Sequence, residues 1–140
     1  MYKFGLALAL VCLAATATPT RADEWEKLNG KWTAKKSSDD GRSWTQVIEI
    51  DKGKFKFRIL SSSGDVRIYA EGDVKIEKYG PFNALKFYNI KGGESVDFLD
   101  PVDDDRTVIY QLGYDTLTVA EDFDKERENP PSAGKYTKSK

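Results

Sequence analysis

The chain has 140 residues, the length of one domain, and its 22 basic and 23 acidic residues nearly cancel. Its single cysteine, Cys12, lies in the leader segment described next, and it has no histidine. These counts exclude disulfides, Cys/His zinc sites and histidine-dependent catalysis in the mature domain. The charge balance also argues against nucleic acid as the main partner.

Residues 1–22 have the features of a secretory signal peptide. A lysine supplies a positive start, Phe4–Ala15 is apolar, and Thr20-Arg21-Ala22 is a small-x-small cleavage site. The apolar run is too short to remain as a membrane anchor, and a lipid anchor at Cys12 is disfavoured because the residue before it is not small. We therefore expect a secreted or periplasmic domain over 23–140. It would have 20 basic and 23 acidic residues, a net charge of −3, and no integral membrane span.

A short helix is predicted at the start of this domain. Asp23–Leu28 is compatible with a helix, and it ends at Asn29-Gly30, the residues that most readily close a helix in the left-handed conformation. Lys31–Lys35 then leaves as a first strand. It carries Trp32, which any first strand could place in a core.

Beyond this point, short runs with period-two alternation are separated by turn residues. Asp-Gly and Lys-Gly turns and the interruption at Glu71-Gly72-Asp73 divide the chain into predicted strands. These strands cover Trp44–Ile50, Lys54–Ile59, Val66–Ala70, Val74–Glu77, Ala84–Ile90, Ser95–Leu99, Arg106–Leu112, Leu117–Ala120 and Lys135–Lys138. Short strands at even spacing predict an all-β barrel or sandwich. Consecutive hairpins favour an up-and-down antiparallel β-barrel of about eight strands, whose closure leaves no exposed edge.

The strand predicted at Lys54–Ile59 has the cleanest alternation. Phe55, Phe57 and Ile59 fall on one face, and Lys54, Lys56 and Arg58 on the other. This is the pattern of a half-buried antiparallel strand, so we expect the aromatic face to point into the barrel.

Two short motifs carry a family resemblance. Leu28, Gly30 and Trp32 form a Leu-x-Gly-x-Trp opening, and Tyr110–Val119 reads as a tyrosine, a hairpin turn and Asp-Thr-Leu-Thr-Val. In this order and spacing they resemble the lipocalin-like (calycin-type) domain of small secreted bacterial proteins, most of them uncharacterised. The resemblance implies that Gly30 and Trp32 are structural, with the tryptophan plugging the closed end of the barrel.

The chain departs from the family pattern at two places. Tyr114 stands where the family often has a glycine before the aspartate of the second hairpin. Many lipocalins also place an arginine from the last strand over the tryptophan. Here the closing segment offers only Lys135, Lys138 and Lys140, with Arg127 as a weaker substitute.

The resemblance implies a barrel that holds a small apolar or amphipathic ligand, or none. An inward-facing aromatic set would form the contacts, and the candidates are Tyr110, Phe55, Phe57 and Phe87. Core packing is the favoured role of Tyr110, which shares its face with Val108 and Leu112. An arginine or tyrosine could bind an acidic headgroup only from the inner face. The alternation places Arg58, Tyr69 and Tyr88 outside, opposite apolar sets such as Val66-Ile68 and Leu85-Phe87.

Two other chemistries are disfavoured by the sequence. The acidic stretch Asp100–Asp105, with Asp97, offers oxygen ligands for calcium but lacks EF-hand spacing, so a solvated loop is the better interpretation. Paired carboxylates can hydrolyse glycosides without histidine, but no pair stands out by spacing. We therefore predict no metal, no cofactor, no catalytic residue and no enzymatic activity.

The main alternative is a barrel that recognises another protein. Periplasmic protease inhibitors have a similar size and strand layout, although their usual disulfide cannot form here. A cavity filled entirely by side chains would favour this alternative or a structural role, whereas an open cavity would favour a small hydrophobic ligand. In either case a monomer is expected.

Overall fold

The computed structural model describes residues 21–139, so the predicted leader up to residue 20 lies outside the described residues. The chain opens with the helix α1 (Arg21–Leu28), which begins two residues before the predicted start. The strands that follow are β1 (Gly30–Ser37), β2 (Ser43–Asp51), β3 (Lys54–Ser61), β4 (Val66–Tyr79), β5 (Phe82–Gly93), β6 (Asp100–Val102), β7 (Arg106–Leu112), β8 (Thr116–Glu121) and β9 (Ser132–Lys138).

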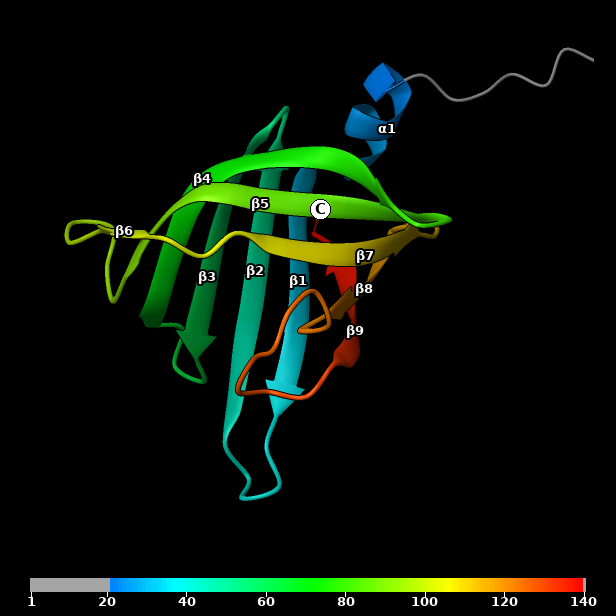
Figure 1. Ribbon diagram of the computed structural model, residues 1–140. Helices are drawn as coiled ribbons and strands as arrows, with labels where there is room; N and C mark the ends of the chain where they lie inside the picture. Colours follow the sequence, from blue (N-terminus) through cyan, green and yellow to red (C-terminus); the bar gives the residue numbers. More distant parts are fainter. Residues whose placement is uncertain (1–20, 140) are drawn as a thin grey trace, which may run out of the picture.

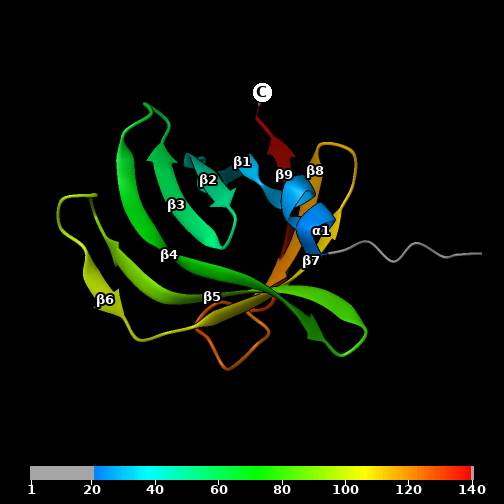
Figure 2. The same cartoon turned by 90° about the horizontal axis from the view of Figure 1, so that it is seen from above.

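Eight of the strands in residues 21–139 close into an antiparallel barrel, which confirms the predicted fold class. Strands β1 to β5 pair in chain order, β5 pairs with β7, β7 with β8 and β8 with β9, and the pairing of β9 with β1 completes the ring (Figure 1). The short β6 and the longer β7 pair with successive parts of β5. In the view along the barrel, α1 lies beside β9 and β7 at one end (Figure 2). We call this the closed end, and the opposite end the open end.

Two predicted strand boundaries were wrong. The segments on either side of Gly72 form one strand, β4, because the pairing with β5 absorbs the interruption as a bulge between Glu71 and Asp73. An added Cβ at Gly72 would lie 2.8 Å from the backbone oxygens of Tyr88 and Asn89, so the bulge depends on glycine.

The predicted strand Ser95–Leu99 is a turn-rich connection. Gly92 and Gly93, which were expected to end the preceding strand, instead extend β5 by pairing with Ala70 and Tyr69. The chain then turns back sharply, and the next strand, β6, begins inside the acidic segment that was expected to be a loop.

The closed end is filled by side chains around Trp32, which is only 1 % exposed. Its indole Nε1 donates to the backbone oxygen of Leu28, 2.8 Å away, at the end of α1. The ammonium of Lys138 on β9 lies 5.3 Å from the centroid of the ring, so the cation over the tryptophan is one of the three lysines that the closing segment offers. Gly30, the first residue of β1, has φ +135°, a backbone conformation that favours glycine. An added Cβ there would also lie 2.8 Å from Lys138 Cε.

Candidate functional site

The barrel encloses a cavity of about 550 Å³ toward its open end. Small-molecule sites usually have volumes of roughly 300–1,000 Å³. Most of the lining is apolar and comes from the inner faces of β2 to β8: Ile48, Ile50, Phe55, Phe57, Ile59, Ile68, Ala70, Leu85, Phe87, Ile90, Val102, Val108, Leu117 and Val119. The interior is therefore not filled completely by side chains.

Three of the four predicted contact residues line this cavity. Phe55 and Phe57 project inward from β3, as the alternation predicted, while Lys54 and Lys56 are exposed. Phe55 packs against Phe87 of β5 in an edge-to-face arrangement, with ring centroids 4.8 Å apart. The inner wall thus presents a rigid aromatic surface to whatever occupies the barrel.

Tyr110, the fourth candidate, does not line the cavity. It is 4 % exposed in the core of the closed end, and its hydroxyl donates to the carboxylate of Glu24 on α1. Burial, together with this hydrogen bond, raises the pKa of Tyr110 above its ordinary value. Tyr110 therefore ties the helix to the barrel floor.

The outer face confirms the predicted direction of Arg58 but adds a buried tyrosine. Arg58 Nη2 lies 2.7 Å from Glu49 Oε1, and Tyr69 is its cross-strand partner on β4. Tyr69 is only 6 % exposed, its hydroxyl donates to Glu71, and it also borders the inner cavity. The alternation that places Tyr69 outside therefore did not predict its buried environment.

Charged side chains join the lining near the open end. They are Glu94, Asp104, Arg106 and Glu121. Arg106 has its Nε 3.6 Å from Asp104 Oδ2 and its Nη1 3.6 Å from Asp122 Oδ1. The guanidinium in the lining is therefore already flanked by two carboxylates.

Asp104 is part of a larger ion-pair cluster beside the barrel mouth. Arg127 Nη1 donates to Asp104 Oδ2 over 3.0 Å, and Lys125 also binds Asp104. Arg127 Nε and Nη2 both donate to Asp124, each over 2.8 Å, and these bonds hold the pKa of Asp124 well below its usual range. Arg127 thus fastens the β8–β9 connection, and it does not cover Trp32.

Two carboxylates of the lining, the exposed Glu94 and the half-buried Glu121, have no such partner within the described residues. Glu121 is the one that lies deeper in the barrel. It ends the inward series Leu117, Val119, Glu121 on β8. Within residues 21–139, no side chain forms a hydrogen bond or ion pair with its carboxylate, although Lys36 and Arg106 act on it electrostatically. Burial dominates and raises the pKa of Glu121.

Tyr136 of β9 adds a polar tip to the same cavity. It is buried, and its hydroxyl donates to Gln46 Oε1 of β2 over 2.9 Å. Sequence reasoning did not select Glu121, Arg106 or Tyr136. Continuing the two-residue period from Leu117 and Val119 would have found Glu121, because the next inward position is that glutamate.

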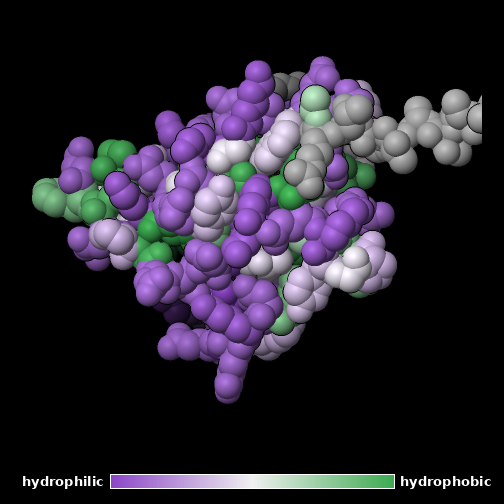
Figure 3. Space-filling model, turned by 45° about the horizontal axis from the view of Figure 1, so that its top comes forward, coloured by the Kyte–Doolittle hydropathy of each residue, from purple (hydrophilic) through white to green (hydrophobic). Residues whose placement is uncertain are grey.

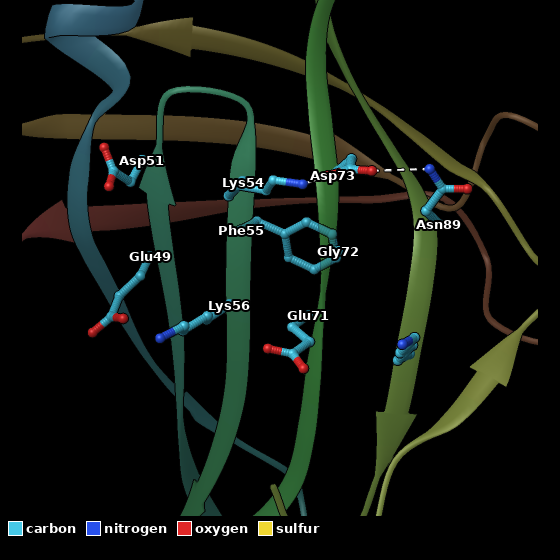
Figure 4. Close-up of a pocket in the computed structure, with 10 residues that line it drawn as sticks. Glu49, Asp51, Lys54, Phe55, Lys56, Glu71, Gly72, Asp73 and Asn89 are labelled. Carbon is cyan, nitrogen blue, oxygen red and sulfur yellow. Dashed lines mark hydrogen bonds and ion pairs between the residues drawn. The ribbon is translucent and has the colours of Figure 1, made fainter.

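A second hollow lies on the outer face of β2 to β5 (Figure 4). Acidic and basic residues alternate across it, with Lys54 paired to Asp73 and Asn89 Nδ2 donating to Asp73 Oδ2 over 2.9 Å. Its members are Glu49, Asp51, Lys54, Phe55, Lys56, Glu71, Gly72, Asp73, Asn89 and Lys91. This hollow is lined mainly by charged side chains, whereas the inner cavity combines apolar walls with a half-buried carboxylate that has no ion pair among the described residues. The inner cavity is therefore the candidate site.

Hydrophobic side chains are exposed at one edge of the open end. Figure 3 shows them gathered over the β5–β6 connection in an otherwise mostly hydrophilic surface. Phe98 is 80 % exposed there, and Ile68, which lines the cavity, is 46 % exposed. The cavity therefore reaches the surface through an entrance with apolar side chains.

The acidic stretch after β5 is not arranged as a metal centre. Among residues 21–139, no three His, Cys, Asp or Glu side chains are placed to hold a metal ion. Asp104 binds basic side chains instead.

No family model, curated protein or solved structure matches the chain. Within the described part of the chain, no helix has the length and apolar character needed to span a bilayer.

Proposed function

We propose that this protein is an exported, monomeric lipocalin-like binding protein that holds a small apolar or amphipathic molecule inside its barrel. The observation that carries the proposal is the aromatic-walled cavity of about 550 Å³. An unfilled apolar cavity of this size favours a ligand, because well-packed domains contain few voids larger than a water molecule.

The barrel is packed with side chains at its closed end and hollow toward its open end, and this division supports the same proposal. Trp32, Leu28 and Tyr110 fill the floor, and α1 closes it through the bonds to Leu28 and Glu24. A ligand entering from the open end would meet Phe57 and Phe87 but would not reach Trp32. The alternative of a protein-binding barrel has less support, because it requires no such cavity.

Filling the cavity tests the proposal. Ile59 of β3 lines the cavity, and the next residue, Leu60, has no place in that lining. Ile59→Trp should fill the space, whereas Leu60→Trp adds the same side chain outside it. The neutral fluorescent probe N-phenyl-1-naphthylamine should bind the wild-type protein and Leu60→Trp with similar affinity. It should bind Ile59→Trp at least about tenfold more weakly, the loss expected for about 1.4 kcal/mol.

Equal affinities in the two variants would contradict binding inside the barrel. Absence of binding to the wild-type protein would favour the protein-binding alternative. Urea unfolding of both variants serves as the control that each remains folded.

A further inference from the structure

The negative charge of the protein is concentrated at the open end. Five connections lie there: residues 38–42, 62–65, 94–99, 103–105 and 122–131 (Figure 1). Together they contain twelve acidic and three basic residues, a net charge of −9, although the whole chain carries only −1. The strands and the closed end therefore carry the compensating positive charge. A mouth of one sign attracts ligands of the opposite sign and raises their local concentration.

The charged side chains that line the cavity are also mostly acidic. Arg106 is flanked by Asp104 and Asp122, and Asp104 is in turn bound by Lys125 and Arg127. These groups are already paired within the protein. Two carboxylates of the lining, Glu94 and Glu121, have no hydrogen bond or ion pair within the described part of the chain. Glu94 is exposed at the rim, whereas Glu121 is half-buried and points inward from β8, so Glu121 is the carboxylate placed to meet a ligand inside the cavity.

The neighbouring walls suit a cation as well as an apolar body. Phe57, Phe87 and Tyr136 line the same cavity, and the faces of aromatic rings attract cations. An anionic headgroup would find only Arg106 in the lining, and it would have to compete there with two resident carboxylates.

We propose that the cavity selects a cationic amphiphile, an apolar molecule with one protonated amine or quaternary ammonium group held by Glu121. This inference rests on the proposed function and names its ligand class. The apolar body lies between the aromatic walls, and the ammonium group lies toward the mouth, where Glu121 supplies the opposite charge. The acidic connections around the mouth add attraction at longer range.

Three ligands with the same chain and different heads test the inference: decylamine, decanol and decanoate, each below its aggregation concentration. Displacement of N-phenyl-1-naphthylamine gives the three affinities at pH 7. Decylammonium should bind about tenfold or more tightly than decanoate, the ratio expected for a charge-assisted hydrogen bond. The affinity of decanol should lie between those of decylammonium and decanoate. Added salt should reduce the ratio of the decylammonium and decanoate affinities.

Two variants with the same change in charge identify the group responsible. Glu121→Gln should remove most of the preference for decylammonium and leave decanol binding nearly unchanged. Glu126→Gln alters an exposed glutamate of the β8–β9 connection outside the lining and should keep the preference. Arg106→Gln removes the basic residue of the lining and should widen the preference, a second test if Glu121→Gln folds poorly.

The possible outcomes separate this inference from the proposed function. If the probe and all three ligands fail to bind, the proposed function is wrong. If decanol or decanoate binds as well as decylammonium, the function stands and the inference is overturned. Equal preference in Glu121→Gln and Glu126→Gln would also overturn it, because the charge of Glu121 would then have no special role.

Discussion

Replacing Trp32 by alanine should destabilise the protein more than the same change at either other tryptophan. Trp32 is 1 % exposed and lies where α1, β1 and β9 meet, so truncation leaves a cavity that the rigid barrel floor cannot easily fill. A buried aromatic truncated to alanine costs about 3–5 kcal/mol. The Leu28 carbonyl also loses its indole donor, which costs about 1–3 kcal/mol if no water replaces it. The expected total is about 4–8 kcal/mol.

Urea unfolding of the three Trp→Ala variants measures this difference. Trp25 and Trp44 are both half-buried, so their variants should lose less, about 1–3 kcal/mol. Trp32→Phe is the matched control, because it keeps most of the packing and removes the hydrogen bond. A loss in Trp32→Ala no larger than in Trp25→Ala and Trp44→Ala would refute the role of Trp32 as the plug of the barrel floor.

Three further predictions follow from the strand pattern, the ion-pair cluster and the leader. Phe57→Ala should lower the free energy of unfolding by about 2–4 kcal/mol and Lys56→Ala by less than about 0.5, and equal losses would mean that the inward face is misassigned. Because Arg127 lowers the pKa of Asp124, the stability from that pair is present above the ordinary carboxyl pKa and is lost as the pH falls below about 5. Asp124→Asn should therefore show a shallower loss of stability in acid, and an unchanged pH profile would contradict this. Intact mass of exported protein should place the mature N-terminus at or within a few residues of Asp23, and a chain still beginning at residue 1 would exclude cleavage.

The sequence predicts the fold well where one face of a strand is uniformly apolar. The alternation of Phe55 and Phe57 with lysines determines the orientation of β3, because a shift by one residue would move both aromatic rings to solvent. The barrel follows from many such strands joined by short hairpins. The lysine over Trp32 was among the candidates, but the choice of Lys138 depended on the pairing of β9 with β1.

The sequence predicts poorly where glycine or tertiary contacts decide. Gly72 and the Gly92-Gly93 pair were interpreted as breaks, yet each continues a ladder that a distant strand completes. Local propensity contains no information on such a partner. Ile68 was expected inside with the apolar set, and it does line the cavity, but the open end leaves it half in solvent.

The site was predicted only in part for the same reason. Three phenylalanine rings were identified from alternation, whereas Tyr110 was placed by its contact with Glu24, which lies 86 residues earlier in the chain. The sequence does not single out Glu121, because acidic residues are numerous and their spacing does not distinguish one that lines a cavity from one in solvent. Only the closed barrel shows which carboxylates are paired and which of them line the cavity.

The central claim, that the barrel holds a small molecule, is tested most directly by native mass spectrometry of the exported protein. We expect the wild-type protein to carry a small noncovalent ligand that denaturation releases, and Leu60→Trp to carry the same mass. Ile59→Trp should have the mass of the polypeptide alone. A wild-type protein with the bare polypeptide mass, or the same ligand retained by Ile59→Trp, would contradict the account.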